Sequence, residues 1–406
     1  MRELDPKIEL HELLAQQIYG VLQGEVTNGI RLRCSGEDGD MNLWSVMEGN
    51  SLKVQESLLP EFYALCMEVK QKLGFDEAID FYITGNSDVN ARSYATIYED
   101  RPHIIEINSG LFNLMNSEEL KYVVGHEIGH LINMDATIKG LFGFIYPDEE
   151  SMGRCPAFLR KRVQLHDQLA ELSADRYGYM ANENIEACVT AIYKVASGLF
   201  LEKMNVSIQT LMEENNRRLD FFLKESGVSD GSHPVNPIRI RALDLFATAK
   251  TQAALNRGMD ELVGVLQGFI YGEIDEALAN FVAAGGLMVS QLDGKREKSE
   301  EDFILKHLAA FCLFPHKVLK SVEKGDPVKT FNDSVQLILD KAPNLRGELL
   351  RYFINVAFAD GELDGGEMNL IYDFGGKIGF SEGEISNALG NTIQEDFTPK
   401  VSALKL

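Results

Sequence analysis

The stretch that decides the fold and chemistry of this chain is Val123-Val124-Gly125-His126-Glu127-Ile128-Gly129-His130. Its apolar positions predict an amphipathic helix, in which one turn takes about 3.6 residues. His126 and His130 therefore lie on one face and direct two imidazoles at a single ion, with Glu127 beside them. This geometry suits zinc bound by two histidines and a third ligand, with a water in the open position and a carboxylate to take its proton. The same five-residue pattern also occurs in proteins that bind no metal, so the surrounding sequence must decide.

The bulk composition is that of a folded globular protein with two or three domains, since the chain has 406 residues, of which 45% are hydrophobic and 25% charged. A net charge of -23 disfavours nucleic acid and anionic membrane surfaces as partners. The five cysteines are odd in number and form no C-x-x-C pair. This pattern argues against a disulfide framework or a thiolate zinc site, and it favours a reducing compartment.

No segment has the pattern of an export signal or a membrane span. Residues 1–6 are polar and acidic where a secretory signal needs an apolar core. The apolar runs at 138–146 and 198–201 are shorter than the roughly 18–20 residues of a spanning helix. The sequence therefore predicts a cytoplasmic protein without a membrane span.

Local patterns around the motif predict a small sheet followed by helices. Strands are expected at 79–84, 94–98 and 103–107, the last two joined as a hairpin. Ser117 with the acidic residues that follow it is the expected N-cap of the motif helix, and residues 139–153 are expected to form a loop. Further helices are expected at about 8–18, 59–73, 156–181, 184–198, 208–225 and from 238 onward.

Two glycines of the motif helix, Gly125 and Gly129, lower its helix propensity. Such residues are expected where another element packs close to the helix backbone. The partner that we expect is the helix at 156–181.

A third metal ligand must come from another element, and Glu171 on that later helix fits. Glu171 and Asp175 are four residues apart on one face, so one carboxylate can reach the metal while the other accepts the free ring N–H of a ligating histidine. The alternative is a solvated acidic helix face. Such a face is indicated by neighbouring acidic residues, Glu149, Glu150, Asp167 and Glu183.

Residues 58–245 resemble the HtpX-like and CAAX-prenyl-protease group of zinc metalloproteases, which are gluzincins. The resemblance rests on five motifs in the right order: Asn90-Ala91, Ile107-Asn108-Ser109-Gly110-Leu111-Phe112, His126-Glu127-Ile128-Gly129-His130, Glu171-Leu172-Ser173-Ala174-Asp175, and His233-Pro234 followed by Arg239-Ile240. It implies one zinc ion per chain, bound by His126, His130 and Glu171. It further implies that Glu127 is the general base and that Asp175 orients a ligand.

The resemblance also implies how a polypeptide substrate binds. The strand from about 91 to 98, with Asn90, Ala91 and Tyr94, would be a sheet edge on which the substrate adds as a further strand. His233 is a candidate for stabilising the oxyanion, with a proline-flanked capping histidine as an equal alternative, and Arg239 is a weaker candidate for the same task. The remaining histidines are expected to be surface residues or satisfied core residues, and they include His103, His166, His307 and His316.

Residues 277–389 resemble tellurite-resistance TerB-like domains, which are helical modules. The likeness rests on Asp360-Gly361 with Glu367, and more loosely on Asp293-Gly294. Asp360, Asp364 and Glu367 are a candidate cation site, but the ligand alternation and glycine of an EF-hand are absent, which favours a helix-capping turn. We expect this module to be a recruitment or regulatory surface for a protein partner.

The fold expected from these patterns is α+β: a mainly helical gluzincin domain with a small edge-strand sheet, followed by an all-α TerB-like domain. Residues 1–57 would be an N-terminal segment packed on the protease, 58–250 the protease domain and 251–406 the helical domain. The expected function is zinc-dependent endopeptidase activity on cytosolic proteins, including misfolded ones, because the spanning helices of membrane-bound members are missing. The alternative is a latent or inactive metalloprotease that acts as a stress-response adaptor through its TerB-like domain.

Overall fold

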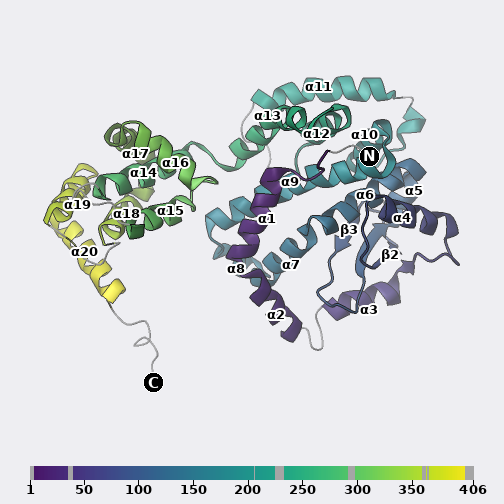
Figure 1. The fold of residues 1–406 in the computed structure, drawn as a ribbon, viewed down its shortest axis with the longest axis horizontal. Coiled ribbons are helices and arrows are strands. Elements are labelled where there is room, and N and C mark those ends of the chain that lie inside the picture. The colour runs from purple at the N-terminus through teal and green to yellow at the C-terminus, as the bar shows by residue number, and fades with distance from the viewer. Residues whose placement is uncertain are drawn as a thin grey trace. The chain divides into compact units, whose positions relative to one another are not determined.

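The structure is a computed structural model of the chain (Figure 1), and it describes residues 4–34, 40–204, 206–224, 233–290, 298–358, 363 and 365–397. The chain divides into two compact units, Met1–Ile270 (unit 1) and Tyr271–Leu406 (unit 2). Each unit has a hydrophobic core of its own. Both are mainly helical, and the described sheet lies in unit 1, so the predicted α+β class is confirmed.

Unit 1 places four strands among many helices. Its strands are β1 (Leu52–Lys53), β2 (Ile79–Thr84), β3 (Ala91–Tyr94) and β4 (His103–Asn108). Its helices are α1 (Glu9–Val21), α2 (Gly24–Cys34), α3 (Asp40–Asn50), α4 (Pro60–Lys72), α5 (Ser109–Leu114), α6 (Ser117–Ile132), α7 (Asp135–Ile145), α8 (Glu149–Gly153), α9 (Ala157–Asn182), α10 (Ile185–Ser197), α11 (Ile208–Lys224), α12 (Asn236–Thr248) and α13 (Gln252–Ile270), with a short 3₁₀ turn at Leu201–Met204.

The sheet has the order β1-β2-β4-β3, so β3 is an edge strand. β2 and β4 pair in parallel, whereas β3 pairs antiparallel with β4, with Ala91 opposite Ile107 and Tyr94 opposite Ile104. The strand expected at 79–84 is confirmed. The strand expected at 94–98 is wrong, because β3 ends at Tyr94 and the backbone N–H of Thr96 donates to the His103 side chain.

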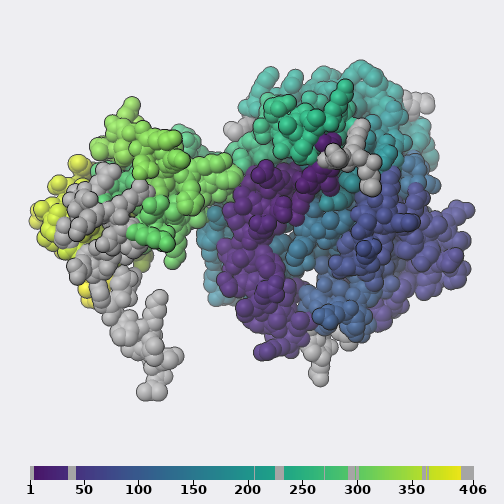
Figure 2. Space-filling view, viewed as in Figure 1, coloured from purple at the N-terminus to yellow at the C-terminus, as the bar shows by residue number. Residues whose placement is uncertain are grey.

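The two faces of the sheet are covered by different helices. Apolar residues of β2 and β4 pack with α4 and α6 in the main core of unit 1. On the other face, Tyr82 and Ile104 pack with Met47 of α3. Helices α1 and α2 form part of the outer surface of unit 1, where they appear in purple (Figure 2).

Ser117 was expected to be the N-cap of the motif helix, but it is the first residue of α6, so the helix begins one residue earlier than expected. Asn116 is the N-cap: its side chain accepts the N–H of Glu119, and the Glu119 carboxylate accepts the N–H of Asn116. This reciprocal capping box satisfies two backbone donors at the helix start. It fixes the first turn of the helix that carries both motif histidines.

α6 and α9 lie side by side (Figure 1), and the contact is close because both helices use glycine. A Cβ atom built on Gly125 would lie 2.6 Å from the Cβ of Ala181, and one on Gly129 would lie 2.9 Å from the Cβ of Tyr177. The expectation that these two glycines make room for another element is confirmed. The element is α9, which carries Glu171.

The loop expected at 139–153 is wrong, because α7 and α8 occupy most of this segment. Ile138 and Leu141 bury their side chains against unit 1, which stabilises α7 despite two glycines in its sequence. α8 begins with a capping box between Asp148 and Ser151.

The division between the units falls after α13 rather than near Lys250. α13 packs against α9 and α12, both of which belong to unit 1. Its buried side chains are apolar and lie along one face: Leu255, Met259, Leu262, Leu266 and Ile270. The expected boundary at 250/251 therefore cuts through the packing of unit 1.

Unit 2 is helical throughout its described residues. Its helices are α14 (Glu273–Ser290), α15 (Lys298–Leu308), α16 (Pro315–Lys324), α17 (Pro327–Lys341), α18 (Arg346–Ala357), α19 (Gly365–Lys377) and α20 (Glu382–Phe397). Its core contains a cluster of aromatic rings, Phe281, Phe331, Phe353 and Phe374. Asp293, Gly294, Asp360, Gly361 and Asp364 lie outside the described residues, so the structure does not test the expected cation site.

No helix of the described ranges in either unit is both long and apolar enough to cross a bilayer.

Candidate functional site

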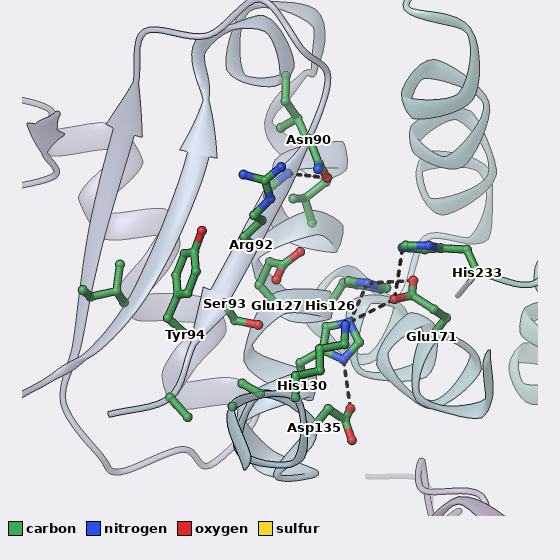
Figure 3. A pocket seen from close by; sticks show the side chains of 18 of the residues that line it. Asn90, Arg92, Ser93, Tyr94, His126, Glu127, His130, Asp135, Glu171 and His233 are labelled. Atoms are coloured by element: carbon green, nitrogen blue, oxygen red, sulfur yellow. Dashed lines mark hydrogen bonds and ion pairs between the residues drawn. The ribbon is translucent and has the colours of Figure 1, made fainter. Parts of the chain in front are cut away.

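Three side chains converge where α6 packs on α9 (Figure 3). The Nε2 atoms of His126 and His130 are 3.1 Å apart, and the Glu171 carboxylate oxygens lie 3.5 Å and 3.6 Å from them. Donor atoms bound to one zinc at about 2.0–2.2 Å in a tetrahedral arrangement are separated by roughly 3.3 Å. The three donors therefore already have the spacing of a metal site.

Each of the two imidazoles is oriented by a buried carboxylate. The Nδ1 of His126 lies 3.0 Å from Asp175 Oδ1, and the Nδ1 of His130 lies 2.9 Å from Asp135 Oδ2. Because a carboxylate accepts, each Nδ1 carries a proton. This leaves Nε2 of each ring facing Glu171 as the atom that would ligate a metal, which would replace any proton held there.

Asp175 is itself fixed by two further groups. Arg239 of α12 donates Nε to Oδ2 at 2.9 Å and Nη2 to Oδ1 at 2.6 Å, and the Tyr122 hydroxyl donates to Oδ1 at 2.6 Å. The bidentate pair between Arg239 and Asp175 fixes the plane of the carboxylate as well as its position. Arg239 thus contacts the orienting carboxylate, and its Nη2 also lies 3.5 Å from Glu171 Oε2.

The charges at this centre favour a cation. Burial opposes protonation of His126, but hydrogen bonds to Asp175 and Glu171 outweigh it and raise its pKa to about 10. Burial also acts to raise the pKa of Glu171, yet His126 and Arg239 hold that pKa well below its usual range. In the same way Arg239 keeps the pKa of Asp175 low against the effect of burial. The carboxylates are therefore ionised and stabilise positive charge between the imidazoles.

A cavity of about 710 Å³ opens beside the three donors. Glu127 is 7% exposed and lines it, with its side chain between β3 and the histidines (Figure 3). The edge strand forms one wall through a continuous run of residues: Asn90, Ala91, Arg92, Ser93 and Tyr94. A substrate in this cavity would lie between an open strand edge and the metal-site residues.

The structure brings together most of the site residues that the sequence indicated. His126, Glu127, His130 and Glu171 line the cavity. Asp175 lies directly behind His126. Asn90, Ala91 and Tyr94 line the cavity from β3.

His233 lies at the cavity with an exposed side chain, and its Nε2 is 3.4 Å from Glu171 Oε1. Glu367, a member of the candidate cation site, lies in α19 of unit 2 and not in unit 1.

Two residues of the site were missed, Asp135 and His11. Asp135 follows His130 by five residues and begins α7, of which residues 139–145 were expected to be part of a loop. His11 lies in α1, and its Nε2 is 2.8 Å from Asp135 Oδ1. Asp135 was detectable as an acidic residue close behind the motif, but no sequence pattern links it to His11.

The other histidines have varied environments. The side chain of His103 lies 2.8 Å from Glu77, that of His307 donates to the carbonyl of Phe303, and His316 is exposed. These three match the expectation of surface or satisfied residues. His166 does not, because it is fully buried and its Nε2 has no hydrogen-bond partner among the described residues.

Comparisons with known proteins agree with this geometry. The family model of peptidase family M48 matches residues 67–145, which include α6 and both motif histidines. The plastoglobule-localized metallopeptidase 48, chloroplastic, of Arabidopsis thaliana is 26% identical over 212 residues, which cover 48% of this chain and 59% of that protein. A protease HtpX homolog of Thermococcus kodakarensis is 28% identical over 89 residues, or 22% of this chain and 30% of that protein. A protease HtpX homolog of Trichormus variabilis is 25% identical over 99 residues, which cover 23% of this chain and 33% of that protein.

No solved structure gives a significant match. The chain spans between about a third and three fifths of the length of these curated relatives. Within that span the site and the comparisons support one class, a metallopeptidase. More narrowly, they support an HtpX-like metalloprotease of the M48 kind, and such an enzyme has a metal cofactor that is typically zinc.

Proposed function

We propose that this protein is a zinc-dependent endopeptidase whose metal is held by His126, His130 and Glu171. The single observation that carries the proposal is the convergence of these three donors at metal-site spacing, with the Nδ1 of each imidazole held by a carboxylate so that Nε2 is the atom turned toward the metal position. When bound, zinc would supply a Lewis acid that polarises the scissile carbonyl and makes the attacking water more acidic.

Glu127 is the residue proposed to move the proton. It takes the proton of the attacking water and returns it to the leaving amine, so one carboxylate serves as base and then as acid. Its position at the cavity, adjacent in sequence to the first histidine, supports this role. His233 is proposed to donate toward the developing oxyanion, which its exposed side chain at the same cavity allows.

β3 is proposed to bind the substrate backbone. The N–H of Asn108 donates to the carbonyl of Asn90, so the backbone of Asn90 points toward β4. In an antiparallel pair the backbone groups of successive residues point alternately toward and away from the partner strand. Those of Ala91 and Ser93 therefore point away from β4, toward the open edge. The Ala91 N–H donates to the side-chain oxygen of Asn90 and not to β4, which supports this orientation. An extended polypeptide adding to this edge would pass beside Glu127.

The substrate class that we propose is an unfolded or misfolded polypeptide in the cytoplasm. An extended chain is what strand addition requires, and folded proteins seldom expose one. Unit 2 is proposed to be a TerB-like recruitment or regulatory module that binds a protein partner. The competing proposal, an inactive adaptor, is disfavoured by the intact Glu127 and by the open cavity.

The test is cleavage of unfolded casein by the full-length protein with and without a chelator. We expect chelator-sensitive cleavage and about one zinc per chain by elemental analysis. Glu127→Gln should lose at least about a hundredfold in kcat and keep its zinc, because general acid–base catalysis contributes roughly 10²–10⁴-fold. His126→Ala and Glu171→Ala should lose the metal itself.

His316→Ala serves as the control, since this histidine is exposed on α16 of unit 2. A Glu127→Gln protein as active as the unmodified one would refute the proposed mechanism. Zinc-loaded protein that cleaves no unfolded chain would favour the adaptor.

A further inference from the structure

A histidine of the N-terminal helix is buried directly behind the metal site. His11 of α1 is 0% exposed, and its Nε2 lies 2.8 Å from Asp135 Oδ1. The other oxygen of the same carboxylate, Oδ2, lies 2.9 Å from Nδ1 of His130. Asp135 is therefore shared between a proposed metal ligand and a residue that lies outside the segment matched by the M48 family.

The hydrogen bonds around His11 form one consistent series. The backbone N–H of Ile8 donates to Ser173 Oγ at 3.2 Å, and Ser173 Oγ lies 3.0 Å from His11 Nδ1. Because Asp135 only accepts, His11 must carry its proton on Nε2, so Nδ1 is free to accept the Ser173 hydroxyl. Every donor thus has an acceptor, from the start of α1 to the ring of His130.

Burial keeps this imidazole neutral, since it lowers the pKa of His11 against the pull of Asp135. A neutral His11 leaves the carboxylate with its full negative charge to share with His130. The arrangement matches the one behind His126, where Arg239 of α12 fixes Asp175. The two ligating histidines are therefore held from opposite ends of the unit 1 sequence.

We propose that His11 is a positioning residue for the metal site: through Asp135 it fixes the ring of His130 in its ligating orientation. This inference deepens the proposed function and rests on the same metal site. It gives the N-terminal segment a role in metal retention. α1 is then a structural part of the active centre, although no sequence motif connects the two.

A second cation held by His11, Asp135 and His166 is the alternative, since these three groups also lie close together. The contact distance argues against it. Two ligands of one metal ion lie roughly 3.3 Å apart, whereas His11 Nε2 and Asp135 Oδ1 are at hydrogen-bond distance.

The test compares two variants of the full-length protein, His11→Leu and His11→Gln. Leucine fills similar space without a donor, whereas the glutamine amide can still donate to Asp135. Zinc affinity is measured by competition with a chromophoric chelator, and the ligand geometry is read from the visible spectrum of the cobalt(II) form. We expect His11→Leu to bind zinc about 10–100-fold more weakly with an altered cobalt spectrum, as for other partners of ligating histidines. His11→Gln should recover most of the affinity.

His103→Leu is the control and should leave both readouts unchanged. If His11→Leu does not fold, Ser173→Ala replaces it, because losing that hydroxyl frees the His11 ring and should weaken zinc binding in the same direction. Zinc affinity and cobalt spectrum equal to those of the unmodified protein would overturn the proposal. The proposal would also be overturned if the unmodified protein bound two zinc ions per chain and the His166→Ala variant bound one.

Neither readout depends on proteolysis. A protein that binds zinc in this way but cleaves nothing would therefore refute the proposed function and leave the role of His11 standing.

Discussion

At the scale of single residues, a fully buried lysine supports the start of the motif helix. Lys194 of α10 is 1% exposed, and its ammonium donates to Glu119 at 2.8 Å, to Glu202 at 2.5 Å and to the carbonyl of Leu114 at 3.2 Å. Burial alone would lower the pKa of Lys194, but the two carboxylates raise it. Glu119 is also the partner of the N-cap Asn116 in the capping box of α6, so the same carboxylate serves the ion pair and the cap.

Lys194→Met should therefore destabilise the protein by about 3–5 kcal/mol, since it leaves the Glu119 carboxylate buried without its cation. The free energy of unfolding is measured by urea denaturation. Arg218→Met is the control: Arg218 pairs with Glu214 on the surface with 63% of its side chain exposed, and losing such a pair costs less than about 1 kcal/mol. If both substitutions lower the free energy of unfolding equally, the buried ion pair stabilises the protein no more than the exposed one.

The sequence predicted the site residues that lie in recognisable motifs and missed those that meet only in space. The pairing of His126 and His130 follows from helical periodicity, whereas Glu171 was assigned as the third ligand through the family resemblance. His11 and Asp135 are 124 residues apart in the chain. Their contact depends on how α1 packs on α7 and α9, which no local pattern encodes.

At the scale of elements, the distance between α6 and α9 decides whether the donors converge. Gly125 is the tightest point from the α6 side, and on α9 a Cβ built on Gly178 would lie 2.5 Å from the ring of Tyr122. Because the two helix backbones approach so closely, the Glu171 side chain on α9 is long enough to reach His126 and His130 on α6. A wider separation would move the third donor away from the other two.

Gly125→Ala should destabilise the protein by about 1–3 kcal/mol and reduce zinc occupancy, because its Cβ would meet Ala181 and the carbonyl of Tyr177, at 2.6 Å and 3.0 Å. Gly143→Ala in α7 is the matched control. It has open space around its Cβ, so alanine there should stabilise the helix by roughly 0.5–1 kcal/mol. Thermal melting with zinc analysis measures both, and a stabilised Gly125→Ala protein would contradict the packing argument.

The proposed substrate edge is testable at Ser93. Ser93→Pro removes a backbone N–H that points away from β4, so the sheet keeps its hydrogen bonds while the open edge loses a donor. We expect kcat/KM on an extended peptide to fall about tenfold with zinc content unchanged. Ser93→Ala changes the side chain alone and should remain close to the unmodified rate. If both variants cleave equally well, the substrate does not pair with β3.

Elements with strong periodicity were predicted well, and glycine-rich ones were not. α4, α9 and β2 follow their apolar patterns. α7 was missed because Gly140 and Gly143 lower its local propensity, and its helix is stabilised by tertiary burial instead.

At the scale of the whole molecule, the two units have separate cores, and the end of unit 1 is set by α13. Four of its side chains, Leu255, Met259, Leu262 and Leu266, are at most 4% exposed. Burying each such side chain stabilises the fold by about 1.5–3 kcal/mol. The sequence suggested Lys250 because the pattern is nearly all helical from about Thr251 onward, but such a pattern does not reveal which unit buries an amphipathic helix.

Truncation after Ile270 should therefore leave a fragment that unfolds cooperatively and binds zinc like the full chain. Truncation after Lys250 should not, because it uncovers the faces of α9 and α12 that α13 packs against, and α9 carries Glu171. Urea denaturation and zinc titration of the fragments 1–250 and 1–270 compare the two. If fragment 1–250 matches 1–270 in both measurements, α13 contributes nothing to unit 1. If it unfolds at lower urea and loses zinc, the helix that follows the predicted boundary is part of what holds the metal-binding unit together.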